Sequence, residues 1–284
     1  MKRSVLITGL ARNVGDRIEG EIIRLERAFR NFEEISFFVV ESDSEDTTVR
    51  ELEKLQSSRG NFRFNSLGTL RFQIPDRVTR IAFCRDAYMR EIRQNPRYQS
   101  FDFICIVDFD LENDSLSASG IESCFSRSDW CGVFANQKGA YYDIYALRSR
   151  NWSETNCWES DRLLREEGLD PNISRHIAVY SKMRKVDIHG PWIPVESAFG
   201  GLAIYRRKCI ADTNYQSIEF LNSGDCEHVL FNKSLVQRNH KLFINPFLTN
   251  FSWNDHNKTN TYFNKIRREL KVFYVFWRDY IKDS

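Results

Sequence analysis

Phe101-Asp-Phe-Ile-Cys-Ile-Val-Asp-Phe-Asp110 is an apolar run that ends abruptly in two carboxylates spaced two residues apart. Side chains alternate along a strand, so Asp108 and Asp110 would share one face while Phe109 points the other way into the packing. Two like charges at the dry end of a strand are costly unless a cation compensates them. Such oxygen ligands suit Mg²⁺ or Mn²⁺, with the phosphates of a substrate completing the shell. The stretch therefore predicts a buried strand that delivers a metal site, and a strand followed by an Asp-rich turn is the alternative.

Segments of alternating type precede this stretch. The sequence predicts strands at residues 4–10, 35–40 and 62–65, and helices at 18–29, 49–55 and 77–93. Strand, helix and strand in succession favour a parallel sheet. Thr48 and Glu51 have the spacing of a capping box at the start of the second helix. On the third helix Arg85 falls on the apolar stripe with Ile81 and Tyr88, so we expect this cation to need an anionic partner.

The second half of the chain is less regular. The sequence predicts a helix at 115–125 and strands at 130–135 and 141–147, followed by a loose stretch from 148 to 194 with one convincing helix at 158–167. We interpret the loose stretch as an insertion or lid. Order returns in strands near 197–205 and 241–244 and a helix near 225–236, and an aromatic, basic segment runs from 261 to 281. A single α/β domain with an irregular C-terminal half is the simplest organisation.

The composition is that of an ordinary globular protein. The 284 residues, 42% of them hydrophobic, can build a sizeable core. A net charge of only +2 gives no reason to expect a nucleic-acid partner. No apolar run approaches the roughly 18 residues that span a bilayer, and seven scattered cysteines fit reduced thiols. We therefore expect a cytoplasmic protein, either soluble or peripheral at a membrane.

Four stretches between residues 4 and 135 form an ordered set: Gly9-Leu-Ala-Arg-Asn13, Glu41-Ser-Asp-Ser-Glu-Asp-Thr-Thr48, Arg80-Ile-Ala-Phe-Cys-Arg-Asp86 and Val107-Asp-Phe-Asp110. Their order and spacing resemble the nucleotide-sugar glycosyltransferases of the GT-A fold, and within that fold the fungal capsule-associated α-1,3-mannosyltransferase family. The second half matches more loosely, through residues 196–205 and 224–231. The resemblance implies an α/β fold of GT-A type, with a Rossmann-like mixed, mainly parallel sheet flanked by helices.

The resemblance also divides the single domain of residues 1–284. It implies a nucleotide-sugar-binding half over 4–135, an acceptor-side half over 136–260 with the irregular insertion near 148–194, and a C-terminal helix over 261–284. Loops that follow parallel strands meet at one edge of an open sheet, so we expect the first two stretches and the acidic pair to line one crevice.

Roles for individual donor-site residues follow from the resemblance. It implies that the first two loops hold the nucleoside through Thr8, Gly9, Arg12 and Glu41. It places Arg80 and Arg85 near the diphosphate, or next to the acidic pair that they would order. Asp110 would coordinate the metal directly, and Asp108 would contact the ribose or the metal-bound water. A helix-capping turn after residue 41 and a surface salt-bridged helix are the alternatives.

A third metal ligand and a catalytic acid are sought in the second half. His228, His240 and His256 compete as ligands, and we favour His256, in a polar loop after a late strand; a solvated loop histidine is the alternative. Glu227 and Asp225 are the candidate catalytic residues, with Glu227 favoured. In an inverting enzyme Glu227 would be the general base; in a retaining enzyme, which the resemblance implies, it would steady the acceptor or the oxocarbenium face. Helix capping is the alternative for both acids.

The resulting functional hypothesis is metal-dependent transfer of mannose or another hexose. The donor would be a GDP- or UDP-sugar, the acceptor a hydroxyl of a glycan or of a lipid-linked acceptor, and the cofactor Mn²⁺ or Mg²⁺, as in polysaccharide biosynthesis. Such a reaction needs its leaving group stabilised, because the departing diphosphate gains negative charge. Gly200-Gly201 predicts either close approach of the acceptor or a bulge. The C-terminal segment predicts either a packed helix or contact with a membrane interface.

Three other functions stay open. A haloacid-dehalogenase-like phosphohydrolase carries Asp-x-Asp on its first strand, whereas this motif follows three strand-like segments. A sugar nucleotidyltransferase would want a glycine-rich first loop, and residues 9–13 are poor in glycine. A non-catalytic module that binds a nucleotide sugar or glycan would share all of these motifs.

Overall fold

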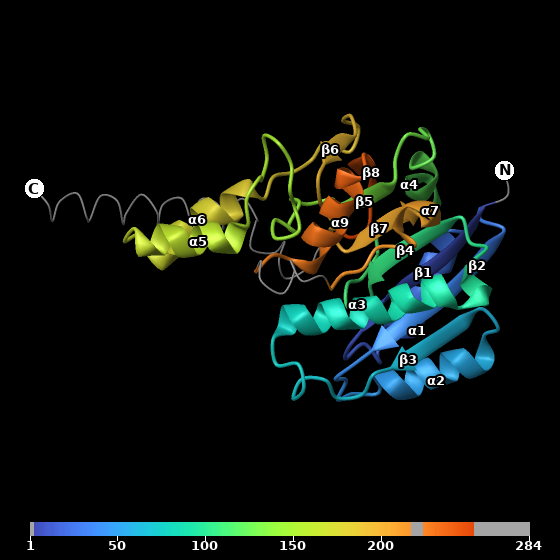
Figure 1. Ribbon diagram of the computed structural model, residues 1–284. Helices are drawn as coiled ribbons and strands as arrows, with labels where there is room; N and C mark the ends of the chain where they lie inside the picture. Colours follow the sequence, from blue (N-terminus) through green and yellow to red (C-terminus); the bar gives the residue numbers. More distant parts are fainter. Residues whose placement is uncertain (1–2, 217–223, 253–284) are drawn as a thin grey trace, which may run out of the picture.

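Eight strands form one mixed sheet in the part of the chain that the computed structural model describes, residues 3–216 and 224–252 (Figure 1). The strands are β1 Ser4–Ala11, β2 Glu34–Glu41, β3 Phe62–Ser66, β4 Phe103–Asp108, β5 Gly132–Asn136, β6 Ile193–Val195, β7 Leu202–Arg206 and β8 Leu242–Thr249. Their order is β3-β2-β1-β4-β7-β5-β8-β6. The first four are parallel, β7 runs antiparallel to β4 and β5, and β6 runs antiparallel to β8. The predicted α/β class with a mixed, mainly parallel sheet is therefore confirmed.

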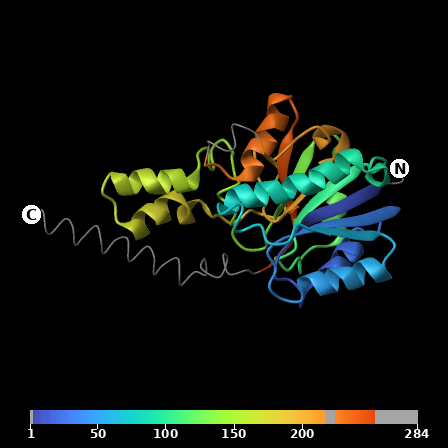
Figure 2. The ribbon, with the colours of Figure 1, turned by 60° about the horizontal axis from the view of Figure 1, so that its bottom comes forward.

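Helices cover both faces of this sheet. They are α1 Ile18–Ala28, α2 Thr48–Ser58, α3 Arg77–Gln94, α4 Ala118–Ser123, α5 Cys157–Glu166, α6 Pro171–Ala178, α7 Arg207–Ile210 and α9 Glu227–Gln237, with short 3₁₀ turns at Pro96–Tyr98 and Tyr180–Lys182. One buried cluster joins α3 and α9 to one face, and a second joins α1, α2 and α4 to the other (Figure 2). Within the described residues, none of the helices is both long and apolar enough to cross a membrane.

The alternation of β4 explains the apolar run that precedes the acidic pair. Ile104 and Ile106 belong to the cluster on the α3 side, whereas Cys105 and Val107 belong to the cluster on the α1 side. A strand buried on both faces reads as a continuous apolar run. Phe109 is fully buried with the α1-side cluster, as the alternation predicts.

Gly9 lets β1 and β4 lie side by side near the ends that carry the candidate site. A Cβ atom at this position would stand 1.9 Å from the carbonyl oxygen of Val107. That oxygen is backbone and cannot move without disturbing the strand before Asp108. The glycine is therefore required by the packing of the sheet.

We expect Gly9→Ala to lower the free energy of unfolding by about 3 kcal/mol, at the upper end of overpacking effects. Gly20→Ala is the matched control, because Gly20 lies exposed on α1 with nothing within 4 Å of the added methyl group. Alanine there should raise stability by about 0.5–1 kcal/mol through helix propensity. Urea unfolding midpoints measure both, and a Gly9→Ala midpoint equal to that of the wild type would contradict the packing argument.

Some local predictions are wrong. Residues 141–147, predicted as a strand, contain a turn at 144–146, and residues 198–201 belong to no strand. The predicted capping box does not form: Thr47 is the N-cap residue, and the Thr48 hydroxyl accepts a hydrogen bond from the amide of Val14 at 2.7 Å. Thr48 thereby ties the loop after β1 to the loop after β2. The same hydroxyl donates to the carboxylate of Asp46, so Thr48 has a local partner as well as a long-range one.

The predicted insertion at 148–194 holds more structure than its sequence suggests. Besides α5, which was predicted, it contains α6 and the edge strand β6. Figures 1 and 2 show α5 and α6 side by side, projecting away from the sheet. The C-terminal helix predicted over 261–284, with its proposed membrane contact, lies outside the described residues.

Candidate active site

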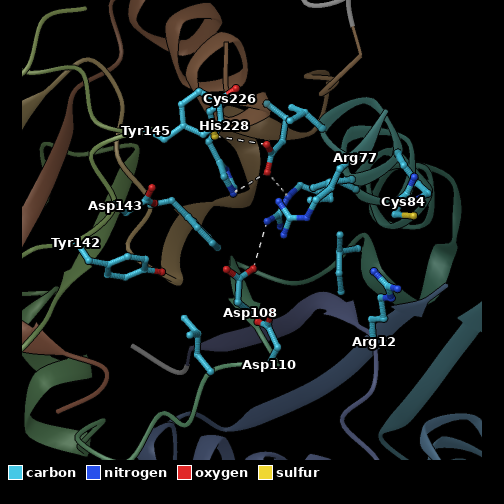
Figure 3. Close-up of a pocket in the computed structure, with 18 of the residues that line it drawn as sticks. Arg12, Arg77, Cys84, Asp108, Asp110, Tyr142, Asp143, Tyr145, Cys226 and His228 are labelled. Carbon is cyan, nitrogen blue, oxygen red and sulfur yellow. Dashed lines mark hydrogen bonds and ion pairs between the residues drawn. The ribbon is translucent and has the colours of Figure 1, made fainter. Parts of the chain in front are cut away.

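A cavity of about 1010 Å³ opens where β1, β2 and β4 end. The loops that follow these three strands contribute Arg12, Asp43 and Asp110, and β4 itself contributes Asp108. Residues of α3, of the turn at 142–145, of α5 and of the start of α9 complete the lining (Figure 3). The predicted convergence of strand-end loops on one crevice is confirmed. Both sequence halves take part in it.

Arg85 joins two of the acids at the centre of this cavity. Its Nε donates to Oε1 of Glu227 at 3.0 Å, and its Nη2 donates to Oδ1 of Asp108 at 3.2 Å. The remaining terminal nitrogen donates to the hydroxyl of Tyr88 at 3.3 Å, and the guanidinium lies over the ring of Phe199. The side chain of Arg85 is only 5% exposed. The anionic partner predicted for Arg85 is therefore a pair of carboxylates, those of Glu227 and Asp108.

The negative charge around the acidic pair is only partly compensated by Arg85. Burial raises the pKa of Asp108 to about 7; Arg85 opposes the rise, whereas the charges of Asp110 and Glu227 add to it. Burial also raises the pKa of Asp143, which lines the same cavity. A divalent cation would relieve this crowding of carboxylates around one guanidinium.

The donor set fits Mg²⁺ or Mn²⁺. Asp108 and Asp110 offer carboxylate oxygens, and Figure 3 shows the two side chains next to each other at the end of β4. Among the described residues, no third histidine, cysteine or carboxylate gathers with them within 4.8 Å. Mg²⁺ is commonly held by one or two carboxylates, with substrate phosphates and water supplying the rest.

Most residues predicted for the site line this cavity. They are Arg12, Arg80, Arg85, Asp108, Asp110 and Glu227. Thr8, Gly9, Glu41 and Asp225 do not line it.

The predicted nucleoside contacts Thr8 and Glu41 are engaged elsewhere. The Thr8 hydroxyl donates to the carbonyl of Phe38 at 2.7 Å inside the sheet. Glu41 accepts from the amide of Ser44 at 2.9 Å with one oxygen and from the Ser66 hydroxyl with the other. Both therefore shape the sheet edge and the loop after β2 rather than the cavity wall.

The acceptor-side predictions fare differently. Asp225 accepts from Nη2 of Arg148 at 2.6 Å and from the side-chain amide of Asn156 at 3.0 Å, and so anchors the insertion. Gly200 and Gly201 have φ of +68° and +84° and form the turn before β7, outside the cavity lining. The carbonyl of Gly201 accepts from the amide of Asp108 at 3.0 Å, so this turn positions the acidic pair.

The three candidate histidine ligands separate in space. His228 lines the cavity, 2% exposed and stacked on Phe199 at 3.9 Å between ring centroids. Burial lowers the pKa of His228 well below its ordinary value, so the ring is neutral. Neither ring nitrogen has a hydrogen-bond partner among the described residues, and Nε2 lies 3.6 Å from Glu227. His240 lies outside the cavity, and His256, the favoured ligand, falls outside the described residues.

Asp43 is a functional candidate that the sequence arguments did not single out. With φ of +61°, it accepts from the amides of Leu70 and Arg71 at 3.0 and 2.9 Å and pairs with Nε of Arg80 at 3.3 Å. Its carbonyl accepts from Nε of Arg12 at 3.3 Å. Asp43 thus contacts two of the cavity arginines, Arg12 and Arg80. In the sequence, the one indication of a role for Asp43 was its position within the polar loop Glu41–Asp46.

Aromatic side chains form another part of the cavity lining, which we call the aromatic wall. It consists of Tyr142, Tyr145, Trp158, Tyr180 and Phe199. Tyr145 donates to the carbonyl of Gly224 at 3.0 Å and packs against Trp158, which is 44% exposed. The wall draws on a turn that was predicted as a strand and on the insertion, so sequence reasoning missed it. The high aromatic content was the one available signal.

Comparisons with known proteins concern solved structures only. No protein-family model matches the chain, and no curated protein matches it. A structure of S. aureus TarS 1-349 in complex with UDP-GlcNAc matches this chain with a TM-score of 0.46 at 16% identity. The match covers 92% of this chain and 62% of the TarS chain. The mannosyltransferase PcManGT from Pyrobaculum calidifontis, in complex with GDP-Man and Mn²⁺, matches with a TM-score of 0.48 at 10% identity. That match covers 89% of this chain and 57% of the PcManGT chain.

The chain thus spans 57–62% of the length of these two solved structures. With TM-scores below 0.5, the likenesses identify neither a family nor an activity for this chain. The resemblance to the fungal capsule mannosyltransferases stays a prediction.

Proposed function

We propose that this chain is a metal-dependent glycosyltransferase that moves a hexosyl group from a nucleoside-diphosphate sugar to a hydroxyl of a glycan or lipid-linked acceptor. One observation carries the proposal: a single cavity is lined by the acids of Val107-Asp-Phe-Asp110, by Arg12, Arg77 and Arg80, and by the aromatic wall. The acids suit a metal ion, the arginines suit a diphosphate, and the aromatic residues suit a sugar ring. Mannose, retention of configuration and the nature of the acceptor are the finer parts of the proposal.

The donor would lie along the strand-end loops. Arg12, Arg77 and Arg80 line this side, and guanidinium groups bind phosphate oxygens in a bidentate manner. Arg80 is already oriented by Asp43 and by the carbonyl of Ile74 at 2.6 Å, so little side-chain freedom would be lost on binding. The backbone of the loops after β1 and β2 would then receive the nucleoside.

The acidic pair would hold the cofactor. Asp108 and Asp110 would bind Mn²⁺ or Mg²⁺, which when bound offsets the negative charge of the departing diphosphate. Arg85 keeps Asp108 in place and separates it from Glu227. Positioning of this kind fixes the acids before the substrate arrives.

Glu227 is the acid best placed to act on the sugar or the acceptor. Arg85 engages its Oε1, whereas the partner of Oε2 among the described residues is the weak thiol donor of Cys226 at 3.4 Å. Oε2 is therefore available to accept a hydrogen bond from an acceptor hydroxyl or to stabilise positive charge on the sugar. The second role belongs with a retaining reaction, as the family resemblance implies.

The aromatic wall supplies a surface for sugar rings. Tyrosine and tryptophan combine an apolar face with a polar group, which suits a carbohydrate that presents both C–H and hydroxyl groups. Trp158 belongs to α5, which together with α6 forms the helical hairpin of the insertion at 148–194 (the inserted hairpin). The acceptor would therefore lie between this hairpin and the sheet.

The phosphohydrolase alternative fits the cavity less well. A phosphohydrolase of the haloacid-dehalogenase type is expected to use its first Asp as a nucleophile with a lysine nearby. Here Asp108 is ion-paired with Arg85, and no lysine is among the described residues that line the cavity.

A thermal-shift screen tests the proposed function. We expect GDP or UDP, or one of their sugars, to stabilise the protein in the presence of Mn²⁺ and to do so much less in EDTA. The nucleotide with the largest shift identifies the donor. If none of these compounds stabilises the protein with Mn²⁺, the proposed function is wrong.

Glu227→Gln should reduce transfer by about a hundredfold to a thousandfold, because it removes the charge of the acid while keeping its size. Binding of the nucleotide with Mn²⁺ should stay within about threefold, since the acidic pair and the arginines are untouched. Asp225→Asn, outside the cavity, should have a much smaller effect on transfer. Single-turnover kinetics with the identified donor would measure both, and equal losses in the two variants would argue against the role of Glu227.

A further inference from the structure

A second group of metal-ligating side chains lies away from the cavity. The sulfur atoms of Cys131 and Cys209 and a ring nitrogen of His240 all lie within 4.8 Å of one another. It is the one group of three or more potential ligands of this kind in the part of the chain that the structure describes. Cys131 directly precedes β5, Cys209 lies in α7, and His240 stands two residues before β8.

These residues come from three segments that the backbone brings together. The amide of Cys131 donates to the carbonyl of Lys241 at 2.8 Å, and its own carbonyl accepts from the amide of Arg206 at 2.9 Å. Both cysteines are buried, and His240 is half-buried. The group is therefore held in place by the sheet itself, with solvent reaching it from the histidine side.

The chemistry of the group favours a soft divalent metal. The set offers two cysteine sulfur atoms and one histidine nitrogen, all within 4.8 Å of one another. Cysteine sulfur and imidazole nitrogen are the ligands that zinc prefers.

We propose that Cys131, Cys209 and His240 form a zinc site, with water as the fourth ligand. With Zn–S bonds of about 2.3 Å and Zn–N bonds of about 2.0–2.1 Å, ligand atoms in a tetrahedron stand roughly 3.4–3.8 Å apart. The three ligand atoms all lie within 4.8 Å of one another, so a small adjustment of the side chains would give that geometry. The hard cations Mg²⁺ and Mn²⁺ do not suit two sulfur ligands.

This zinc site lies at the opposite end of the sheet from the acidic pair. In the β4–β7 ladder Phe103 pairs with Arg206, next to α7, whereas Val107 pairs with Leu202, next to the acids. The site would join the start of β5, α7 and the approach to β8. The zinc site is independent of the proposed function.

Cobalt spectroscopy on the full chain tests the zinc site. After reduction and removal of metal, titration with Co²⁺ should give one equivalent of a species with thiolate-to-cobalt charge transfer and the visible bands of tetrahedral cobalt. Zn²⁺ should displace it. His240→Ala and Cys209→Ser should each weaken the affinity by at least about a hundredfold, since even outer-shell changes cost 10–100-fold.

Two variants serve as controls. Cys124→Ser changes another buried cysteine, one that lies near Cys105 but belongs to no three-ligand group among the described residues, and it should titrate like the wild type. Asp110→Asn should also leave the cobalt spectrum intact, which separates this site from the acidic pair. Because His240 is half-buried, His240→Ala keeps the test valid if Cys209→Ser does not fold.

Several results would overturn the zinc site. They are the absence of a tetrahedral cobalt spectrum in the wild type, an unchanged titration in His240→Ala, loss of the spectrum in Cys124→Ser or Asp110→Asn, or a Cys131–Cys209 disulfide in the protein as purified.

Discussion

Replacing Asp110 by asparagine is expected to lower metal-dependent transfer about a thousandfold, because the lost metal contribution is worth several kcal/mol of transition-state stabilisation. Asparagine has nearly the same size but carries no charge, and Asp110 is exposed at the cavity, so the fold should be unaffected. The nucleotide shift that depends on Mn²⁺ should vanish, whereas the smaller shift in EDTA should remain. Thermal shifts and initial rates, each measured with and without Mn²⁺, separate these effects.

Asp114→Asn is the matched control for Asp110. Asp114 lies four residues further along the same loop, outside the cavity lining, and accepts from the amide of Ser252 at 2.9 Å. We expect its metal-dependent shift and rate to stay within about threefold of the wild type. A Mn²⁺ dependence that survives in Asp110→Asn would show that this residue does not hold the metal.

Arg85→Met should lower the free energy of unfolding by about 3–5 kcal/mol, the usual cost of removing one partner from a buried ion pair. Methionine fills a similar volume but leaves the carboxylates of Asp108 and Glu227 without their shared guanidinium. Loss of Arg85 also removes the charge that opposes the raised pKa of Asp108. In both proteins the folded state holds the Asp108 proton more tightly than the unfolded state, and in the variant it does so more tightly still. The deficit should therefore grow as pH rises above about 7, where the wild type has released this proton and the variant has not.

Urea unfolding in EDTA at several pH values measures this effect. Arg90→Met, on the exposed side of α3, is the control and should stay within about 0.5 kcal/mol of the wild type. Arg85→Lys keeps the charge but cannot bridge both acids, so we expect an intermediate loss. If Arg85→Met is as stable as Arg90→Met at neutral pH, Arg85 does not hold the two acids.

Local patterns in the sequence were enough to predict the fold of the first part of the chain, around β1, β2 and β4. The strands β1, β2 and β4 are buried on both faces and read as apolar runs, and the polar residues after them mark the edge where they end. Asp108, Asp110 and Arg85 were identified because each is a charge set against an apolar pattern. A charged residue within an apolar pattern can be recognised from the sequence alone, without knowledge of its partners in the fold.

Residues whose roles depend on distant partners could not be assigned in this way. Thr8 was predicted as a nucleoside contact from the family resemblance, but its hydroxyl donates to the carbonyl of Phe38 inside the sheet. Thr48 had the spacing of a cap but bonds to Val14 across the loops. The aromatic wall depends on how the inserted hairpin meets the sheet, and no local periodicity encodes that.

The central claim is tested most directly by release of nucleoside diphosphate from the donor that the thermal-shift screen identifies. The wild type and Asp110→Asn would be compared with Mn²⁺ and with EDTA, in the presence of glycan acceptors. The account predicts release by the wild type with Mn²⁺, and about a thousandfold less in EDTA or in Asp110→Asn. Binding of the donor without any release, or release at equal rates with Mn²⁺ and EDTA, would contradict it.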